Sequence, residues 1–195
     1  MKIHTQGFID LKAIVGNETS IINYARVSTG SELATFPLEE RDTKLLRFLL
    51  DNKHGTPFEH VGFTFQAKAP IFVARQWMRH RIGTFNEYSQ RYRKPLETFY
   101  LPTFTEENGF VDDDDRHLYA ELSNTLVKLY HAQHDLRGSL YKSADKRYKK
   151  GTQKHKKARA RAREVSRLMT PVAGYTEFIW TVNLRSLLNF LVQRG

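Results

Sequence analysis

A change of apolar period at Pro70 is the feature that most constrains the fold. Over residues 61–69, apolar side chains alternate with small or polar ones, the period-two pattern of a strand with one buried face. Pro70 suits the first turn of a helix, and residues 71–80 are apolar around much of the helix circumference. This segment therefore predicts a strand that leads directly into a buried helix.

Two further strands are predicted, over residues 8–15 and 176–182, because apolar side chains alternate there as well. Residues 42–54 carry leucines at helical spacing, with Asp42 able to cap the start of a helix and Gly55 to end it. Strands and helices are thus interspersed, and no long linker divides the chain. We expect a single domain of the α+β class.

Three more helices are expected in the second half of the chain. The acids at residues 112–115 should precede a long helix, because negative side chains favour a helix N-terminus. Its apolar seam would consist of Leu118, Leu122, Leu126 and Leu129. Another helix should begin near Ala158 and stop before Pro171. The last helix should carry Leu184, Leu187, Leu188 and Leu191.

The positive charge of the chain is concentrated in one segment. The formal net charge is +10, but residues 146–163 contain ten Lys or Arg and no acid, so the remainder is formally neutral. Lysines at this density repel one another, and a solvated loop or helix is the interpretation we favour. Contact with a polyanion such as nucleic acid is the alternative.

Cysteine is absent from the chain. Disulfides, thiolate metal sites and every mechanism with a Cys nucleophile are therefore excluded, and no metal site is expected. No apolar run approaches the length of about 18 residues typical of a transmembrane helix, and the N-terminus lacks a secretory signal pattern. We expect a soluble, cytoplasmic protein without membrane contact.

Polar side chains crowd the exit of the apolar helix. Arg79, His80 and Arg81 are followed, after seven residues, by Ser89. Guanidinium forks match phosphate oxygens, and a Ser hydroxyl can supplement them. The same cluster is compatible with a solvated helix end, so its residue types alone leave both interpretations open.

This pattern, Arg-His-Arg followed after seven residues by Ser, resembles the signature of the flavin-dependent thymidylate synthases. The similarity extends over most of the chain and includes residues 25–28, 54–60, 69–77 and 180–183. The resemblance implies an α+β fold with helices around a central mixed or antiparallel sheet. It also implies a homotetramer with active sites built from several subunits. The expected reaction converts dUMP to dTMP, with methylenetetrahydrofolate as carbon donor, FAD as hydride relay and NADPH as the usual reductant.

The resemblance also implies the residues of the site. Those expected to bind dUMP are Gln76, Arg79, Glu87, Tyr88, Ser89, Gln90, Arg91, Arg167 and Arg194. Those expected to bind FAD are Ser28, Thr56, Arg79, His80, Arg81, Glu87, Asn183, Arg185 and Asn189, with His54 near the flavin ring. Arg91 and Arg167 suit the dUMP phosphate best. No G-x-G-x-x-G follows a strand, so side chains must hold the cofactor.

Arg194 is the expected catalytic residue, by its match to the family position with that role. Methylation of uracil at C5 requires electron density there, which cysteine-dependent synthases create by adding a thiolate to C6. Without a thiol, an Arg against the pyrimidine edge can favour the N3-deprotonated form and so make C5 nucleophilic. A terminal surface charge is the alternative for Arg194. No obvious base accompanies Ser89, so we expect it to bind phosphate by hydrogen bonding and not to act as a nucleophile.

Two features depart from the family pattern. Family members usually continue past the position of Arg194 with a polar segment and a helix, including a His that contacts the flavin, so this C-terminus is short relative to the family. Residues 146–163 form a more basic and longer stretch than is usual, which we interpret as an insertion. The competing function class is a nucleic-acid or nucleotide-binding protein that retained the scaffold without activity.

Overall fold

The computed structural model describes residues 2–3, 7–93, 96, 98–101 and 113–194. The chain forms two compact units and passes between them five times. Unit 1 comprises Met1–Gly7, Lys68–Arg75 and Tyr88–Glu177. Unit 2 comprises Phe8–Ala67, Gln76–Glu87 and Phe178–Gly195. Neither unit is a continuous segment, which is why no linker marks them in the sequence.

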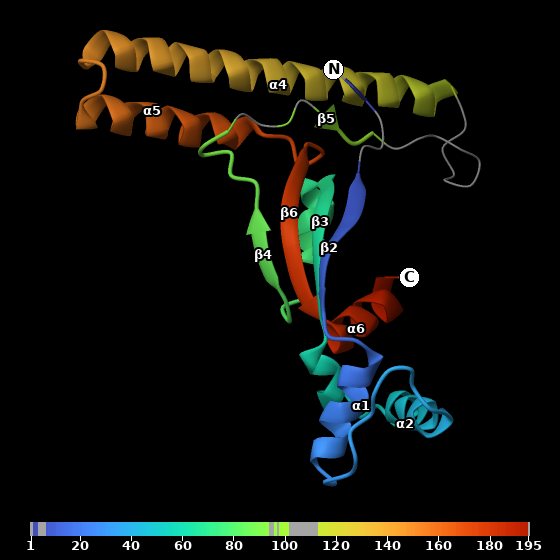
Figure 1. Cartoon of the computed structure of the whole chain (residues 1–195). Helices are drawn as coiled ribbons and strands as arrows, with labels where there is room; N and C mark the ends of the chain where they lie inside the picture. The colour runs from blue at the N-terminus through green and yellow to red at the C-terminus, as the bar shows by residue number, and fades with distance from the viewer. Residues whose placement is uncertain (1, 4–6, 94–95, 97, 102–112, 195) are drawn as a thin grey trace. The chain divides into compact units, whose positions relative to one another are not determined.

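A four-stranded open sheet has the order β2 (Phe8–Val15), β3 (Gly62–Pro70), β6 (Tyr175–Asn183), β4 (Thr84–Glu87). Neighbouring strands point in opposite directions (Figure 1), and β4 pairs with β6 so that Glu87 lies opposite Phe178. The three predicted strands and the antiparallel arrangement are therefore confirmed. Strand β4 is too short to show a period in the sequence.

Strand β2 lies at an edge of this sheet and is exposed along its whole length. Ile9 on its apolar face is 63% exposed and Leu11 is 48% exposed. Asp10 and Lys12 form an ion pair with each other on the alternate positions. The alternation therefore predicts β2 correctly, but no described residue buries its apolar face.

The helices of unit 2 are α1 (Glu18–Val27), α2 (Glu40–Asp51) and α6 (Leu184–Arg194), with a short 3₁₀ helix η1 (Thr56–His60). Helix α6 is confirmed, although Leu188 and Leu191 are exposed. The sequence pattern does not reveal α1, which Asn17 and Ser20 begin with a reciprocal capping box. One core cluster of the unit consists of Ile21, Leu49, Phe58 and Val61.

The expected boundaries of α2 are wrong at both ends. The helix begins at Glu40, because Glu39 is the capping residue and Asp42 lies one turn inside, where its carboxylate accepts the Glu39 backbone N–H. It ends at Asp51 and not at Gly55, because Lys53 takes up the left-handed conformation with φ of 56°. Asp42 is thereby free to pair with a residue of another helix.

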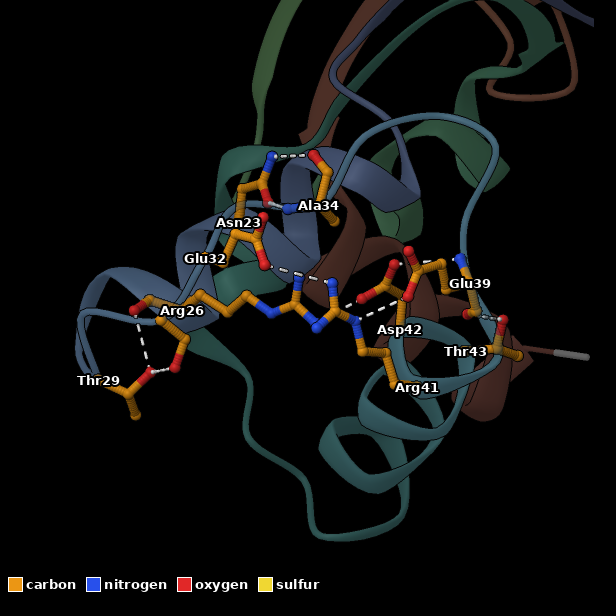
Figure 2. Close-up of polar contacts among 10 residues, drawn as sticks. Asn23, Arg26, Thr29, Glu32, Ala34, Glu39, Arg41, Asp42 and Thr43 are labelled. Atoms are coloured by element: carbon orange, nitrogen blue, oxygen red, sulfur yellow. Dashed lines mark hydrogen bonds and ion pairs between the residues drawn. The ribbon is translucent and has the colours of Figure 1, made fainter.

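Asp42 pairs with Arg26 of α1, as Figure 2 shows. Arg26 Nη2 donates to Asp42 Oδ1, and the two residues are only 9% and 2% exposed. Burial of Asp42 opposes its ionisation, but the Glu39 backbone N–H and the Arg26 guanidinium outweigh burial and hold the pKa of Asp42 below its ordinary value. The pair joins α1 to α2.

In unit 1, α4 (Asp113–Arg147) and α5 (Gln153–Ser166) form an antiparallel hairpin (Figure 1), followed by a 3₁₀ turn η3 (Arg167–Met169). Helix α4 begins inside the acidic run, of which Asp112 lies outside the described residues. Helix α5 begins five residues before Ala158, with Thr152 as its cap, so most of the basic stretch is helical.

The leucine seam predicted for α4 is wrong. Leu126 is buried against Phe99, Leu101 and Tyr130, but Leu118 and Leu122 are 61% and 47% exposed. The predicted buried helix is also shorter and more exposed than expected: α3 (Ile71–Trp77) fully buries Ala74 alone. Two short strands, β1 (Lys2–Ile3) and β5 (Thr98–Phe99), pair in parallel. Among the residues placed here, no helix is apolar enough over a sufficient length to cross a bilayer.

We predict that Arg26→Met lowers Tm much more than Arg41→Met, a matched change at an exposed arginine that pairs with Glu39. The loss of Arg26 leaves the Asp42 carboxylate buried without its counter-charge. Because the pKa of Asp42 is depressed in the folded state, the ion pair stabilises the fold at neutral pH, and this stabilisation is lost as the pH falls below about 4. Thermal unfolding of the wild type and both variants between neutral and acidic pH measures it, and equal Tm values for the two variants would contradict the prediction.

Candidate functional site

An aromatic cluster in unit 2 fixes the segment that follows α3. Trp77 lies edge-on to Trp180 of β6 and stacks on Phe190 of α6, with ring centroids 5.3 Å apart in both pairs. A Cβ atom added at Gly83 would lie 2.7 Å from Trp180 Nε1, so only glycine allows this turn to approach the ring so closely. The Arg-His-Arg segment is thus held between the aromatic cluster and the turn.

Within this segment His80 contacts Arg194, the expected catalytic residue. The His80 ring lies edge-on to Phe190, with centroids 4.8 Å apart, and Arg194 Nε donates to His80 Nε2 at 3.3 Å. A nitrogen that accepts from a guanidinium carries no proton, so the contact requires the neutral tautomer with hydrogen on Nδ1. Arg194 is exposed, as a residue that is to meet a ligand must be.

A pocket of about 480 Å³ in unit 2 brings together three of the residues expected at the flavin. His54, Arg185 and Asn189 supply polar groups together with Lys53, and apolar walls include Phe58 and Val192. Arg185 also donates to Glu59 Oε1, which orients its guanidinium at the rim. A mostly apolar pocket with a few convergent polar groups has the character of a cofactor site.

A second pocket of about 260 Å³ shares His54 and Leu49 with the first. Ser28 and Thr56, both expected at the flavin, line it together with His60. The Ser28 hydroxyl donates to the Ala25 carbonyl at 2.8 Å at the end of α1. The two pockets together therefore gather Ser28, Thr56, Arg185 and Asn189 around His54, which strengthens the expectation for His54.

The other expected residues of unit 2 do not line either pocket. Asn183 caps α6, because its Oδ1 accepts the Ser186 backbone N–H at 2.9 Å. Gln76, Arg79 and Arg81 are exposed at the end of α3 and in the turn after it. Glu87 ends β4 and is exposed. These side chains surround the His80 segment in sequence, but the described contacts do not join them to the pockets.

Five expected dUMP residues lie in unit 1, where Arg91 shares the Glu164 carboxylate with Arg161. Arg91 Nη2 lies 3.3 Å from Glu164 Oε1, and Arg161 Nη1 lies 3.1 Å from Glu164 Oε2. The hydrogen bond from Arg161 and the charges of Arg91 and Arg167 outweigh partial burial and hold the pKa of Glu164 below its ordinary value. Glu164 thus pairs with Arg91 and lies within the electrostatic influence of Arg167, the two arginines expected at the phosphate.

A chain of hydrogen bonds orients Gln90, also in unit 1. Gln133 of α4 is 2% exposed, and its Nε2 donates to Thr170 Oγ1 at 2.7 Å. The Thr170 hydroxyl in turn donates to Gln90 Oε1 at 3.3 Å, which leaves the Gln90 amide N–H groups available. Ser89 Oγ accepts the Arg91 backbone N–H at 3.3 Å. Tyr88 donates its backbone N–H to the Glu177 carbonyl at 2.7 Å.

Comparison with known proteins identifies the family. Residues 11–195 match a family model described as thymidylate synthase complementing protein. The flavin-dependent thymidylate synthase of Thermosipho melanesiensis is 42% identical over 198 residues, which cover 100% of this chain and 79% of that protein. This chain belongs to the flavin-dependent thymidylate synthase family.

Other members of the family are similarly related. The flavin-dependent thymidylate synthase of Thermotoga neapolitana is 38% identical over 190 residues, covering 97% of this chain and 77% of that protein. Among solved structures, a UMP/dUMP methylase PolB from Streptomyces cacaoi bound with 5-Br dUMP has a TM-score of 0.72 and 29% identity. That alignment covers 98% of this chain and 79% of the PolB chain.

Sequence reasoning missed several residues that position the expected site residues. They are Glu59, Gln133, Glu164 and Thr170. Glu164 could have been found, because it is the first acid after the ten basic residues of the 146–163 stretch. Gln133 and Thr170 lie 37 positions apart, and no local pattern relates them.

We predict that Thr170→Val lowers Tm, since it leaves the buried Gln133 amide without its partner, at a cost of about 1–3 kcal/mol. Thr170→Ser keeps the hydroxyl and should be close to the wild type. Thr98→Val is the matched control, because the Thr98 hydroxyl is buried without a hydrogen-bond partner among the described residues. Thermal unfolding of the three variants is the measurement. A Tm for Thr170→Val as high as that for Thr98→Val would show that the hydrogen bond between Gln133 and Thr170 contributes nothing to stability.

Proposed function

We propose that this chain methylates dUMP to dTMP, with methylenetetrahydrofolate as carbon donor, a flavin as hydride donor and NADPH as reductant. Family membership supports the reaction class. The observation that carries the assignment to particular residues is the hydrogen bond between Arg194 and His80 of the Arg-His-Arg segment. It joins the expected catalytic residue to the family signature across 114 positions of the chain.

For dUMP, we propose that Arg91, Arg167 and Ser89 bind the phosphate. Arg91 and Arg161 pair with one carboxylate, Glu164, and the charge of Arg167 acts on the same group. A phosphate can compete for guanidinium donors that are already gathered. Gln90, oriented by Thr170, presents amide donors beside them. Gln76, Arg79, Glu87, Tyr88 and Arg194 complete the proposed substrate set.

For FAD, the residues of unit 2 fit a flavin by the nature of their pockets. Apolar walls suit the ring system, while His54, Arg185 and Asn189 can bind its polar edge or the phosphates. Ser28 and Thr56 add hydroxyl groups in the adjoining pocket. Arg79, His80, Arg81, Glu87 and Asn183 are the remaining proposed FAD contacts. When bound, FAD supplies the hydride that reduces the transferred methylene to a methyl group.

Arg194 is proposed to activate the pyrimidine. Its guanidinium would stabilise negative charge on the uracil edge, favour loss of the N3 proton and so raise the electron density at C5. His80 accepts from Arg194 Nε, which leaves the two terminal nitrogens of the guanidinium as donors for the base. No sulfhydryl is needed in this route, and the chain has none.

We further propose a homotetramer with shared active sites. Leu118 and Leu122 on α4 and Ile9 and Leu11 on β2 are exposed in the single chain, which supports burial by other copies. The proposed dUMP and FAD residues are also divided between the two units. A site completed by several copies would account for both features.

We predict that Arg194→Ala abolishes dTMP formation while Tm stays within a few degrees of the wild type, because the side chain is exposed and makes one long hydrogen bond. Gln193→Ala is the matched control, since Gln193 is exposed on the same turn of α6 and its amide contacts only Asn189 among the described residues. The assay is dTMP formation from dUMP. Wild-type turnover by Arg194→Ala would refute the catalytic role.

The proposed enzyme and a non-enzymatic nucleotide-binding protein are separated by two measurements. Absorbance near 450 nm in the purified protein reports bound oxidised flavin, and tritium release from 5-labelled dUMP reports chemistry at C5. We expect both signals. Bound dUMP with neither flavin absorbance nor tritium release would favour the non-enzymatic alternative.

A further inference from the structure

A polar seam joins α4 to α5 in the basic hairpin. Tyr141 and Asp145 of α4 contact three residues of α5 that are four positions apart, His155, Arg159 and Arg163. Arg137, four positions before Tyr141, donates to the Tyr141 hydroxyl from the same helix. Side chains four apart share one face of a helix, so these residues form a continuous row between the two helices. The two ends of the row differ in charge.

The end beside the loop is balanced. Asp145 receives two hydrogen bonds from Arg159 Nη1, at 2.8 and 3.0 Å, and lies 2.7 Å from Nε2 of the buried His155. His155 Nδ1 accepts the Gly151 backbone N–H, so the imidazole is neutral and donates from Nε2. One carboxylate therefore matches one guanidinium here.

The other end is not balanced. Arg137 Nε and Arg163 Nη1 donate to the same Tyr141 hydroxyl, at 3.2 and 3.5 Å, and no carboxylate in the described part of the chain pairs with either arginine. Arg159 adds a third guanidinium 4.0 Å from the centre of the Tyr141 ring. Arg163 Nε is buried and has no hydrogen-bond partner among the described residues.

Two half-buried cations that share a neutral acceptor repel each other, and a buried N–H without a partner is costly. Burial of the Tyr141 phenol opposes its ionisation, but the hydrogen bonds from Arg163 and Arg137 outweigh burial and hold the pKa of Tyr141 below its ordinary value. The potential at the Tyr141 hydroxyl is therefore strongly positive. An anion placed there would relieve the repulsion and satisfy the remaining donors.

We propose that Arg137, Arg163 and the Tyr141 hydroxyl form a binding site for a phosphate group, separate from the proposed dUMP residues. A phosphate dianion matches the two unpaired charges, and each planar guanidinium fork can offer it paired donors. The Tyr141 hydroxyl accepts from both arginines and so directs its own proton outward, toward the anion. The exposed lysines of the hairpin have no part in the site.

Loss of one positive charge should change phosphate affinity when it is taken from a seam arginine and should not when it is taken from a solvated lysine. Lys156 is exposed on α5, and Lys149, Lys150, Lys154 and Lys157 are exposed beside it. Binding of inorganic phosphate to the full chain is measured by calorimetry at constant ionic strength, with chloride as the balancing anion. We expect Arg163→Gln and Arg137→Gln each to weaken it at least about tenfold, as for a lost charge-assisted hydrogen bond. Lys156→Gln should leave it unchanged.

Two further variants keep the outcome interpretable. Arg167→Gln removes a proposed phosphate ligand of the dUMP site, so a phosphate affinity that Arg167→Gln leaves unchanged and Arg163→Gln lowers belongs to the seam. Tyr141→Phe keeps the ring against Arg159 and removes only the hydroxyl, and we expect folded protein with phosphate binding weakened several-fold. Equal phosphate affinity in Arg163→Gln and Lys156→Gln would overturn the proposal.

A polynucleotide is the competing ligand, and a gel-shift series tests it. Single-stranded and duplex DNA are titrated at about 50 to 200 mM salt with the wild type, Arg163→Gln and a variant in which the five lysines are replaced by Gln. We expect no retention of DNA that depends on the lysines. DNA retention that the five-lysine variant loses and Arg163→Gln keeps, without phosphate binding in the calorimeter, would refute the seam site.

Discussion

The packing of Trp77, Trp180 and Phe190 is the interaction on which the proposed catalytic geometry depends. These rings come from the end of α3, from β6 and from α6, and their centroids lie 5.1 to 5.3 Å apart. His80 rests on Phe190, so the position of His80 relative to Arg194 follows from aromatic packing. Three segments far apart in the sequence are thereby held in one place without a charged side chain.

Local periodicity could predict the strands β2, β3 and β6, because alternation over eight or nine residues is unambiguous. It could not predict β4, which has four residues, nor which face of α4 would be buried. The leucines of α4 suggest one face, but α5 contacts α4 at Tyr141 and Asp145, C-terminal to all four leucines. Which side chains of α4 are buried depends on the segments that pack against the helix. The periodicity of α4 itself does not contain that information.

The residues of the candidate site came from the family resemblance and not from spacing. The structure groups four of the proposed FAD residues around His54 and two of the proposed dUMP residues near Glu164. Residues that act by positioning others, such as Gln133 and Thr170, carry no signature in a single sequence. They become visible only when hydrogen-bond partners from different helices are known.

The exposed edge strand β2 affects how readily newly made chains associate while they fold. Along its outer side no other strand of the described residues pairs with it, so its backbone donors and acceptors, with Ile9 and Leu11 exposed, form a template on which another strand could add. The charged pair of Asp10 and Lys12 interrupts that template at alternate positions and disfavours uncontrolled pairing. Folding yield should therefore fall steeply with protein concentration when these two charges are removed, even where the native structure is unaffected.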